Sequence, residues 1–516
     1  SIPGLDEIIQ LHLRHARSAL SYCIHFHPLT SDRPELIHEE EVIEVKSFPL
    51  NHRIPCYGFL FREKPKPRRM RKDLMPEKMA LQHIVRLKAG ETIYDDAGKE
   101  YIEAMAGLWS VAVGFGEDRL VKAAAKQLSE LPYYHSFSHK SHPQAIALAE
   151  RMVKMAPGKM GKAHFTNSGS EANDTVVKMA GYYNNALGRP NKKKIISRIK
   201  AYHGITLVSA SLTGLPNNHR DFDVPFPQFK HVSCAHHWRN AHEGESEEEF
   251  ATRLAKELED KILAEGPETV AAFIGEPVMG AGGVFVPPRT YWPKIQEVCR
   301  KYDVLVVADE VINGFGRTGT TWGCTTYGIE PDIMICSKQI TSSYVPLAAI
   351  VFTNEIYNGI ADNSAKIGTF GHGFTTSGHP LAMAVAMENL DIIEERGLMQ
   401  RVPQLSPRFL ERLHAFKDHP LVGETRGVGM IGAMELVADK KTKAKNEGRS
   451  WYYTDAFGKK WRFDYDYGYY NIRVTNCPSG KRKNFYIDNL VTKAKAANFR
   501  ANVMVNLHYG AIQLNF

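Results

Sequence analysis

A small-residue motif follows the apolar run that ends near Phe165 and precedes a stretch of helical periodicity. Its residues are Asn167-Ser168-Gly169-Ser170-Glu171-Ala172-Asn173. Where a strand turns into a helix, free backbone N–H groups point at any anion bound there, and Ser168 and Ser170 add hydroxyl donors. The same residues could serve only as a helix cap, so this motif by itself leaves an anion site and a simple cap open.

Acidic residues follow two other apolar runs. Asp309 and Glu310 come directly after the run 304–307, and Glu276 follows the run 270–274. A buried carboxylate without a cationic partner is costly, so such acids need a ligand, a metal ion or an ion pair, for example with Arg317. The chain contains no G-x-x-x-x-G-K-[ST] loop, which argues against a nucleoside-triphosphate site.

A lysine, Lys338, stands two residues beyond the apolar run 333–336. Desolvation at the edge of a sheet favours the neutral amine, which can form a Schiff base with an aldehyde, although a lone lysine is usually a surface residue. An anion cradle, a carboxylate and a strand-end lysine are together what pyridoxal phosphate needs: a phosphate site, an acid for its pyridine nitrogen and an amine for its aldehyde. The combination predicts a pyridoxal-phosphate site.

The elements that must position these residues are short buried strands alternating with helices. Apolar runs rich in β-branched residues recur, and stretches of helical length such as 289–302 separate them; the runs are 194–196, 270–274, 304–307, 333–336 and 348–352. Continuous apolar runs are typical of strands covered on both faces, as in a parallel sheet of a large α/β domain. Ligands of such sheets bind beyond the carboxyl ends of the strands, where the candidate residues lie.

Several motifs stand in the order found in one enzyme family, across about residues 80–437. They are Asp95-Asp96-Ala97-Gly98-Lys99-Glu100-Tyr101, Gly107-Leu108-Trp109, the 167–173 motif, Tyr202-His203-Gly204, Asp309-Glu310-Val311 through Gly319, Ser337-Lys338 and Gly373-Phe374-Thr375-Thr376-Ser377-Gly378-His379-Pro380. On these motifs, residues 76–440 resemble the class III aminotransferases of the fold type I pyridoxal-phosphate family, in their omega-amino acid–pyruvate and amine transaminase branch. The resemblance implies a large domain at about 135–385 with a mostly parallel seven-stranded sheet.

The resemblance also implies roles for the strand-end residues. Lys338 would be the Schiff-base lysine and proton shuttle, and Asp309 would pair with the pyridine nitrogen of the cofactor. Gly169 and Ser170, with Ser168, would hold its phosphate at a helix N-terminus.

Further residues would complete the site by the same resemblance. Tyr202 would stack on one face of the cofactor ring and also contact substrate, Val311 would pack on the other face, and Glu276 would lie beside the cofactor. Trp109 would line the substrate pocket, although a buried core tryptophan is an equally good interpretation. Thr375 would reach the phosphate of a partner subunit's cofactor, which implies a homodimer.

Composition sets broader limits. The chain has 516 residues and a net charge of +8, which does not by itself indicate a nucleic-acid partner. The sequence has no run of 18 apolar residues, so it does not predict a membrane-spanning helix. Seven scattered cysteines and no evident secretory signal predict a cytoplasmic chain with reduced thiols. Cys234, His236 and His237 are residue types that bind metal ions, but no second ligand pair lies at a suitable spacing from them, which disfavours zinc.

The two ends of the chain differ from the family. Residues 1–72 resemble an internal fragment of ribonuclease Z without its metal-binding signature, so we expect this segment to be inactive as a nuclease. Residues 442–516 form a β-rich aromatic segment where the family has a small domain that supplies a substrate-carboxylate arginine, so we expect an incomplete small domain. Arg473 is the nearest surrogate in the sequence.

The predicted function is an aminotransferase that moves an amino group from an amine or omega-amino acid to a keto acid such as pyruvate. A racemase or aminomutase would use the same scaffold. A composite chain, with a cofactor-binding core but little activity, is a further alternative because the ends look foreign to the core.

Overall fold

The computed structural model describes residues 35–39, 43–50, 56–63, 93–94, 100–101, 105–137, 139–444, 450–454, 460–465, 472–476, 504–506 and 511–515. Two compact units divide the chain, residues 1–102 and residues 103–516. In the first unit, β1 (Glu35–Glu39), β2 (Ile43–Leu50) and β3 (Cys56–Glu63) form an antiparallel sheet, and β4 (Ile93–Tyr94) pairs with β5 (Glu100–Tyr101).

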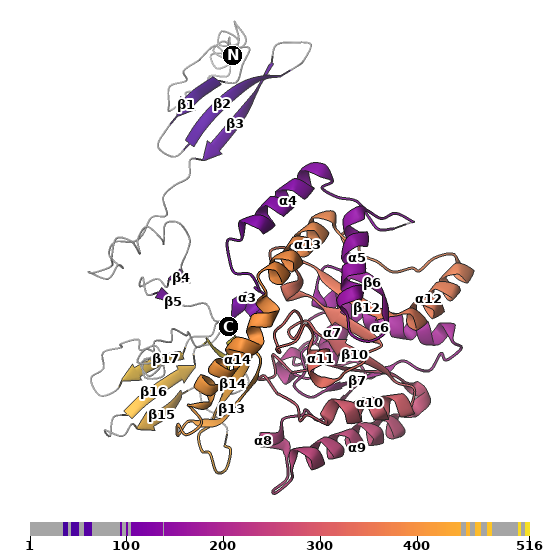
Figure 1. The fold of residues 1–516 in the computed structure, drawn as a ribbon, viewed down its shortest axis with the longest axis vertical. Helices are drawn as coiled ribbons and strands as arrows, with labels where there is room; N and C mark the ends of the chain where they lie inside the picture. The colour runs from indigo at the N-terminus through magenta and orange to yellow at the C-terminus, as the bar shows by residue number, and fades with distance from the viewer. Residues whose placement is uncertain are drawn as a thin grey trace, which may run out of the picture. The chain divides into compact units, whose positions relative to one another are not determined.

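A seven-stranded sheet forms the centre of the second unit (Figure 1). Its strands, in spatial order, are β6 (Met160–Thr166), β12 (Ala348–Thr353), β11 (Ile333–Cys336), β10 (Leu305–Asp309), β9 (Val270–Gly275), β7 (Lys194–Arg198) and β8 (Phe229–Val232). The five strands from β11 to β8 pair in parallel, which confirms the predicted mostly parallel α/β sheet.

One strand, β12, runs antiparallel to both of its neighbours. The run 348–352 was predicted as a strand, but its direction was not apparent from the sequence. The linking segment 337–347 carries only the short turn η4 (Lys338–Thr341), whereas a parallel crossover needs a dozen or more residues. The chain therefore turns back, and η4 is held at the carboxyl end of β11.

Both faces of the sheet are buried, because alternate residues of each central strand enter two different hydrophobic clusters. On β9, Phe273 belongs to one cluster, while Ala272 and Ile274 belong to the other. The first cluster packs against α5 (Pro143–Met155), α9 (Glu247–Glu265), α10 (Tyr291–Lys301) and α13 (Pro380–Glu395), and the second packs against α6 (Gly169–Ala186), α7 (Leu207–Leu212) and α12 (Asn354–Ile367). The result is a three-layer α/β/α arrangement, with apolar sequence runs wherever a strand is covered twice.

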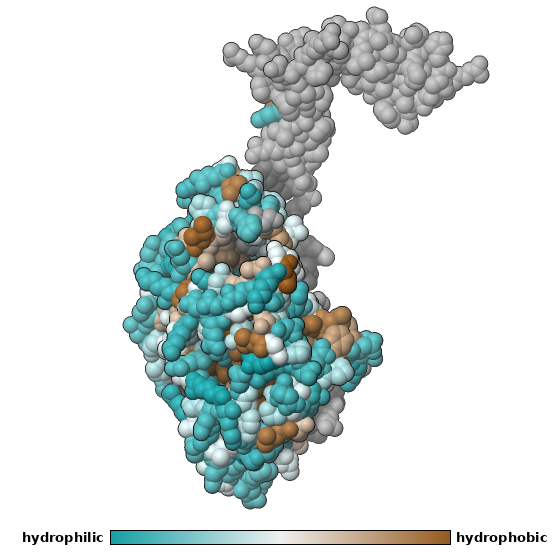
Figure 2. Space-filling view, turned by 90° about the vertical axis from the view of Figure 1, so that its right-hand side faces the viewer, coloured by the Kyte–Doolittle hydropathy of each residue, from teal (hydrophilic) through white to brown (hydrophobic). Residues whose placement is uncertain are grey.

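The helices turn polar residues outward. On the face of the molecule in Figure 2, hydrophilic residues cover most of the described surface, and hydrophobic residues form small scattered patches. The remaining helical segments are α3 (Ala106–Trp109), α4 (Asp118–Glu130), η2 (Pro216–Asn218), α8 (His237–Asn240), η3 (Pro267–Thr269), α11 (Gly323–Tyr327) and α14 (Leu398–His414). Among the described residues, no helix is long and apolar enough to cross a membrane.

The C-terminal strands make two further sheets. β13 (Val422–Val428) and β14 (Ile431–Leu436) form a hairpin, and β19 (Ala511–Asn515) pairs with β14 and with β18 (Met504–Asn506). A separate antiparallel sheet contains β15 (Ser450–Thr454), β16 (Lys460–Tyr465) and β17 (Ile472–Asn476). The strands β15 to β19 all lie in the segment 442–516, which was predicted to be β-rich.

Candidate active site

A cavity of about 460 Å³ opens at the carboxyl ends of β9, β10 and β11, beside the N-terminus of α6. Its wall includes seven of the predicted site residues: Trp109, Gly169, Ser170, Tyr202, Glu276, Asp309 and Lys338. Val311 is an eighth. The topology thus brings together side chains that are spread over about half of the chain, at the sheet edge where an open α/β fold binds ligands.

The N-terminus of α6 forms the floor of the proposed anion cradle. The Ser168 hydroxyl accepts a hydrogen bond from the Glu171 N–H (3.2 Å), so this serine caps the helix and does not line the cavity. Gly169 and Ser170 do line it. The Ser170 hydroxyl accepts from the Ile205 N–H (3.1 Å), which ties the cradle to the loop after Tyr202. The cap interpretation of the motif therefore holds for Ser168, and the anion site stays a prediction for Gly169 and Ser170.

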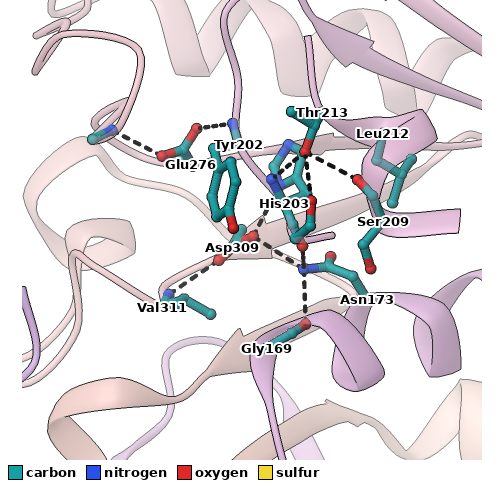
Figure 3. A network of polar contacts seen from close by, with 12 residues as sticks. Gly169, Asn173, Tyr202, His203, Ser209, Leu212, Thr213, Glu276, Asp309 and Val311 are labelled. Carbon is teal, nitrogen blue, oxygen red and sulfur yellow. Dashed lines mark hydrogen bonds and ion pairs between the residues drawn. The ribbon is translucent and has the colours of Figure 1, made fainter. Parts of the chain in front are cut away.

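Asp309, which ends β10, is held by three hydrogen bonds (Figure 3). Its Oδ2 lies 2.8 Å from Nδ1 of His203 and accepts from Nδ2 of Asn173 (3.3 Å), while its Oδ1 accepts from the Val311 N–H (3.1 Å). Asn173 belongs to α6, His203 to the loop after β7, and Val311 follows Asp309 in its own segment, so the buried carboxylate (3% exposed) is fixed in direction from three sides of the chain. Neither His203 nor Asn173 was assigned a role from the sequence.

Asn173 and His203 belong to the 167–173 and 202–204 motifs, although neither residue had a predicted role. Asn173 lies one helical turn after Gly169, whose carbonyl also accepts from its amide (3.1 Å), and its amide donates as well to the His203 carbonyl (2.8 Å). Helical spacing places Asn173 above the cradle, and that is the one sequence signal that could have identified it.

Glu276 closes the opposite side of the cavity. One of its carboxylate oxygens accepts from the Tyr202 N–H (3.2 Å) and the other from the Gly280 N–H (2.8 Å), as Figure 3 shows for the bridge to Tyr202. Burial raises the pKa of Glu276, and burial also raises the pKa of the Tyr202 phenol, with a further contribution from the charge of Asp309. The carboxyl group therefore orients the backbone at Tyr202.

Lys338 begins η4, with a left-handed backbone (φ +48°) that turns its side chain into the cavity. Its Nζ lies 5.7 Å from the centre of the Trp109 ring. Burial lowers the pKa of Lys338, against the opposing effects of Asp309 and Glu276. A depressed pKa increases the fraction of neutral amine, which is the form that attacks an aldehyde.

Of two further predicted residues, Val311 lies on the cavity wall and Thr375 lies outside the cavity. Val311 packs close to the cradle, because a Cβ on Gly169 would stand 3.4 Å from its side chain. Thr375 is exposed and does not line the cavity of its own chain; its carbonyl accepts from the Tyr133 hydroxyl (2.7 Å). The candidate Arg473 lies in β17, and its side chain is outside the described residues.

A histidine and two carboxylates outside this cavity could hold a metal ion: His236, Glu424 and Glu435. Cys234 and His237 are not in this group. Arg426 lies between the two carboxylates, at 2.6 Å from Glu424 and 2.9 Å from Glu435, and Arg239 also pairs with Glu435. Because two guanidinium groups already balance the two carboxylates, the cluster is better described as a buried ion-pair network than as a metal site.

The residues of the cavity fit pyridoxal phosphate. Gly204 packs directly on Ser170, with no room for a side chain, so backbone and hydroxyl donors converge at the start of α6, where a phosphate would be held. A buried acid and a desolvated amine stand on the same cavity wall, as the ring nitrogen and the aldehyde require. The fold and the site together define a fold type I pyridoxal-phosphate enzyme.

Comparison with known proteins identifies the family. Residues 75–459 match the family model for class-III aminotransferases. Gamma aminobutyrate transaminase 1 of Solanum lycopersicum, named as mitochondrial, is 55% identical over 358 residues, which are 69% of this chain and 70% of that protein. The chain belongs to the class III aminotransferases, and it is a pyridoxal-phosphate-dependent enzyme.

Solved structures agree in fold. An omega transaminase from Pseudomonas jessenii in complex with PMP superposes with a TM-score of 0.68 at 64% identity, over 69% of this chain and 79% of that one. An engineered thermostable omega transaminase, PjTA-R6 variant W58G, has the same TM-score at 63% identity, over 69% of this chain and 80% of that one. The resemblance inferred from the motifs is confirmed; the resemblance of residues 1–72 to ribonuclease Z stays a prediction.

The expected location in the cell needs correction. Scattered cysteines and the absence of an evident secretory signal led to the expectation of a cytoplasmic chain. The plant relatives are named as mitochondrial or chloroplastic enzymes, which does not fit that expectation, so it is wrong. The physical reason is that reduced cysteines are equally compatible with compartments other than the cytoplasm, so their pattern does not discriminate among these.

Proposed function

We propose that this aminotransferase moves an amino group from an amine or omega-amino acid to a keto acid such as pyruvate. The observation that carries the proposal is the position of the Lys338 amine, which shares one cavity with the fixed carboxylate of Asp309 and the cradle at the start of α6. Relatives named as gamma-aminobutyrate transaminases and omega transaminases support a donor that is an amine or an omega-amino acid.

In this proposal backbone N–H groups of Gly169 and Ser170 would hold the phosphate at the positive end of α6. Asp309 would keep a proton on the ring nitrogen of the cofactor, because the Asp309 carboxylate is held at the cavity wall by His203 and Asn173. Pyridoxal phosphate, when bound, supplies a protonated ring that withdraws electrons from the amino-bearing carbon.

The remaining residues orient the reactants and move the proton. Tyr202 and Val311 lie on the cavity wall and would contact opposite faces of the ring, and Trp109 would border the substrate. Lys338 would take the proton from the amino-bearing carbon of the donor at its Nζ and would later deliver a proton to the carbon that receives the amino group, which requires the neutral amine that burial favours.

The proposed functional unit is a homodimer. Thr375 is exposed and outside its own chain's cavity, as expected of a residue that contacts the cofactor phosphate of a partner. Leu108, at the cavity wall, is 56% exposed, and Ile205, next to the cradle, is 72% exposed. Large apolar side chains left in water beside a polar site favour a covering subunit.

The test is to locate the cofactor chemically. The purified chain, loaded with pyridoxal phosphate and reduced with borohydride, should carry the cofactor on the peptide that contains Lys338, and it should consume an amine donor when pyruvate is added. Lys338→Ala should lose both properties. Lys122→Ala, which removes an exposed lysine of α4, is the matched control and should retain both.

Three results would contradict the proposal. A Lys338→Ala variant that still carries reducible cofactor would remove the lysine from its role. Racemisation of the donor without amino transfer would indicate the racemase alternative. Cofactor bound at Lys338 without turnover of any amine would indicate the composite chain with little activity.

A further inference from the structure

A tight hairpin of residues 279–285 lies between the candidate active site and the C-terminal strands. Met279 and Phe285 exchange two backbone hydrogen bonds (3.2 and 2.9 Å), and the Gly283 N–H donates to the Gly280 carbonyl (3.0 Å). At its tip Ala281 lines the cavity. The hairpin therefore connects directly with the site on one side.

The hairpin also determines the position of Glu276. The Gly280 N–H donates to one carboxylate oxygen of Glu276 (2.8 Å), and the other oxygen accepts from the Tyr202 N–H (3.2 Å). The hairpin has little space to shift, because a Cβ on Gly282 would overlap the Lys200 carbonyl oxygen. Any movement of residues 280–283 is thus transmitted to Glu276 and to the backbone of Tyr202.

On its other side the hairpin is held by a side chain from a distant strand. Arg426 of β13 donates from Nη2 and Nε to the Gly283 carbonyl (2.6 and 2.9 Å) and from Nε to the Val284 carbonyl (3.2 Å). Its guanidinium carbon lies 4.9 Å from the centre of the Phe285 ring. The planar guanidinium matches this set of acceptors, which a lysine ammonium could not engage in the same way.

The guanidinium is itself oriented from behind. Its Nη1 donates to Glu424 (2.6 Å) and to Glu435 (2.9 Å), and Arg426 is only 7% exposed. With Nη1 fixed by two carboxylates, Nε and Nη2 can point only toward the hairpin. The bonds to Gly283 therefore come from a pre-oriented group, and little conformational entropy is lost in forming them.

We propose that Arg426 is a positioning residue for the aminotransferase site: it holds the 279–285 hairpin so that Gly280 keeps Glu276, and through it Tyr202, in place against the cofactor. The inference rests on the proposed roles of Glu276 and Tyr202 in the site. It assigns a function to β13 that lies outside the large domain, and it makes the C-terminal strands part of the structure that shapes the cavity.

The experiment compares Arg426→Lys with Arg239→Lys in the full chain. Arg239 pairs with Glu435, which Arg426 also contacts. It also contacts the Lys443 carbonyl and the Trp238 ring, neither of which belongs to the hairpin. Both variants weaken the same ion-pair network, so both should lower the thermal midpoint of unfolding. Only Arg426→Lys removes the paired bonds to Gly283.

Three measurements are made on each variant: the dissociation constant of pyridoxal phosphate, the visible circular dichroism of the bound cofactor, and the steady-state kinetics (kcat and KM) with the amine donor. We expect Arg426→Lys to raise the dissociation constant about tenfold, the loss expected from a charge-assisted hydrogen bond. Its visible circular dichroism should also change, because the ring environment at Tyr202 shifts. Arg239→Lys should keep the wild-type values.

Two results would overturn the inference. In the first, Arg426→Lys binds the cofactor with wild-type affinity and an unchanged dichroism spectrum. In the second, Arg239→Lys changes both quantities as much as Arg426→Lys does, which would assign the effect to general stability of the network. Failure of the proposed function is distinguishable from both, because it would appear in the wild-type chain itself, either as no borohydride-reducible link at Lys338 or as no transfer of an amino group from the donor to pyruvate.

Discussion

Replacing Gly204 by alanine should damage the proposed phosphate cradle. Gly204 has φ +134°, a conformation that L side chains rarely adopt, and a Cβ there would stand 2.7 Å from the Ser209 Cβ and 2.9 Å from the Ser170 Cα, with the Ser170 hydroxyl closer still. Two of these contacts are with Ser170, in the first turn of α6. The variant must therefore displace the residue that is proposed to bind the phosphate.

The expected cost has two parts. Forcing an alanine into a positive-φ conformation costs about 1–2 kcal/mol. Overpacking against backbone that cannot move freely costs about 1–3 kcal/mol more. The free energy of unfolding should thus fall by about 2–5 kcal/mol, and the affinity for pyridoxal phosphate should fall with it, because the displaced Ser170 is proposed to bind the phosphate.

Gly188, just beyond the other end of α6, offers a matched control. It also has a positive φ (+72°), but no heavy atom lies within 4 Å of the position of a Cβ. Gly188→Ala should pay only the conformational cost, about 1–2 kcal/mol. The assay is urea unfolding of each variant together with titration of cofactor into the cofactor-free protein. Equal destabilisation by the two variants, or wild-type cofactor affinity in Gly204→Ala, would refute the steric reasoning.

Three further outcomes are expected. Burial raises the pKa of Glu310 from 4.5 to about 7, so the folded state binds the proton more tightly than the unfolded state does. The free energy of unfolding should therefore fall by about 3 kcal/mol as the pH rises from 4.5 to 7. Glu310→Gln should lose this pH dependence in urea unfolding measured across that range. His203→Phe removes the hydrogen bond to Asp309 and should lower kcat about tenfold or more with cofactor still bound, a result that unchanged steady-state kinetics would contradict. Among the residues that the structure describes, four cysteines are buried: Cys234, Cys299, Cys324 and Cys336, and burial raises the pKa of the last three. Iodoacetamide should leave these thiols unlabelled in the native chain and label them in urea, as judged by peptide mass mapping. Labelling in the native chain would disprove their burial.

Local sequence predicted most strands of the central sheet, although β8 was not among them. The runs at 270–274 and 333–336 correspond to β9 and β11, and the helical stretch 289–302 corresponds to α10. These elements were predictable because a strand covered on both faces must be apolar at nearly every position, and that pattern depends on neighbours in the chain. The direction of β12 was not predictable from its own residues, because parallel and antiparallel strands that are covered on both faces need the same apolar pattern.

The candidate site was predictable to the extent that its residues follow strands directly. Lys338 and Asp309 are recognisable because the carboxyl ends of parallel strands meet at one edge. The partners of Asp309 were not recognised. His203 and Asn173 approach it from other segments, at 106 and 136 positions along the chain, and only the folded path of the loops brings them within hydrogen-bonding distance.

The sequence by itself determined the family and most of the strands of the central sheet, since these are encoded in short motifs and local periodicity, and it predicted candidate residues for the site. Only the tertiary structure decided how those residues are held. Ser168 caps α6 while Ser170 faces the cavity, Glu276 orients Tyr202, and Arg426 contacts a hairpin 143 positions away. Hydrogen bonds between distant segments depend on where the chain returns after each loop, and that information is absent from any single motif.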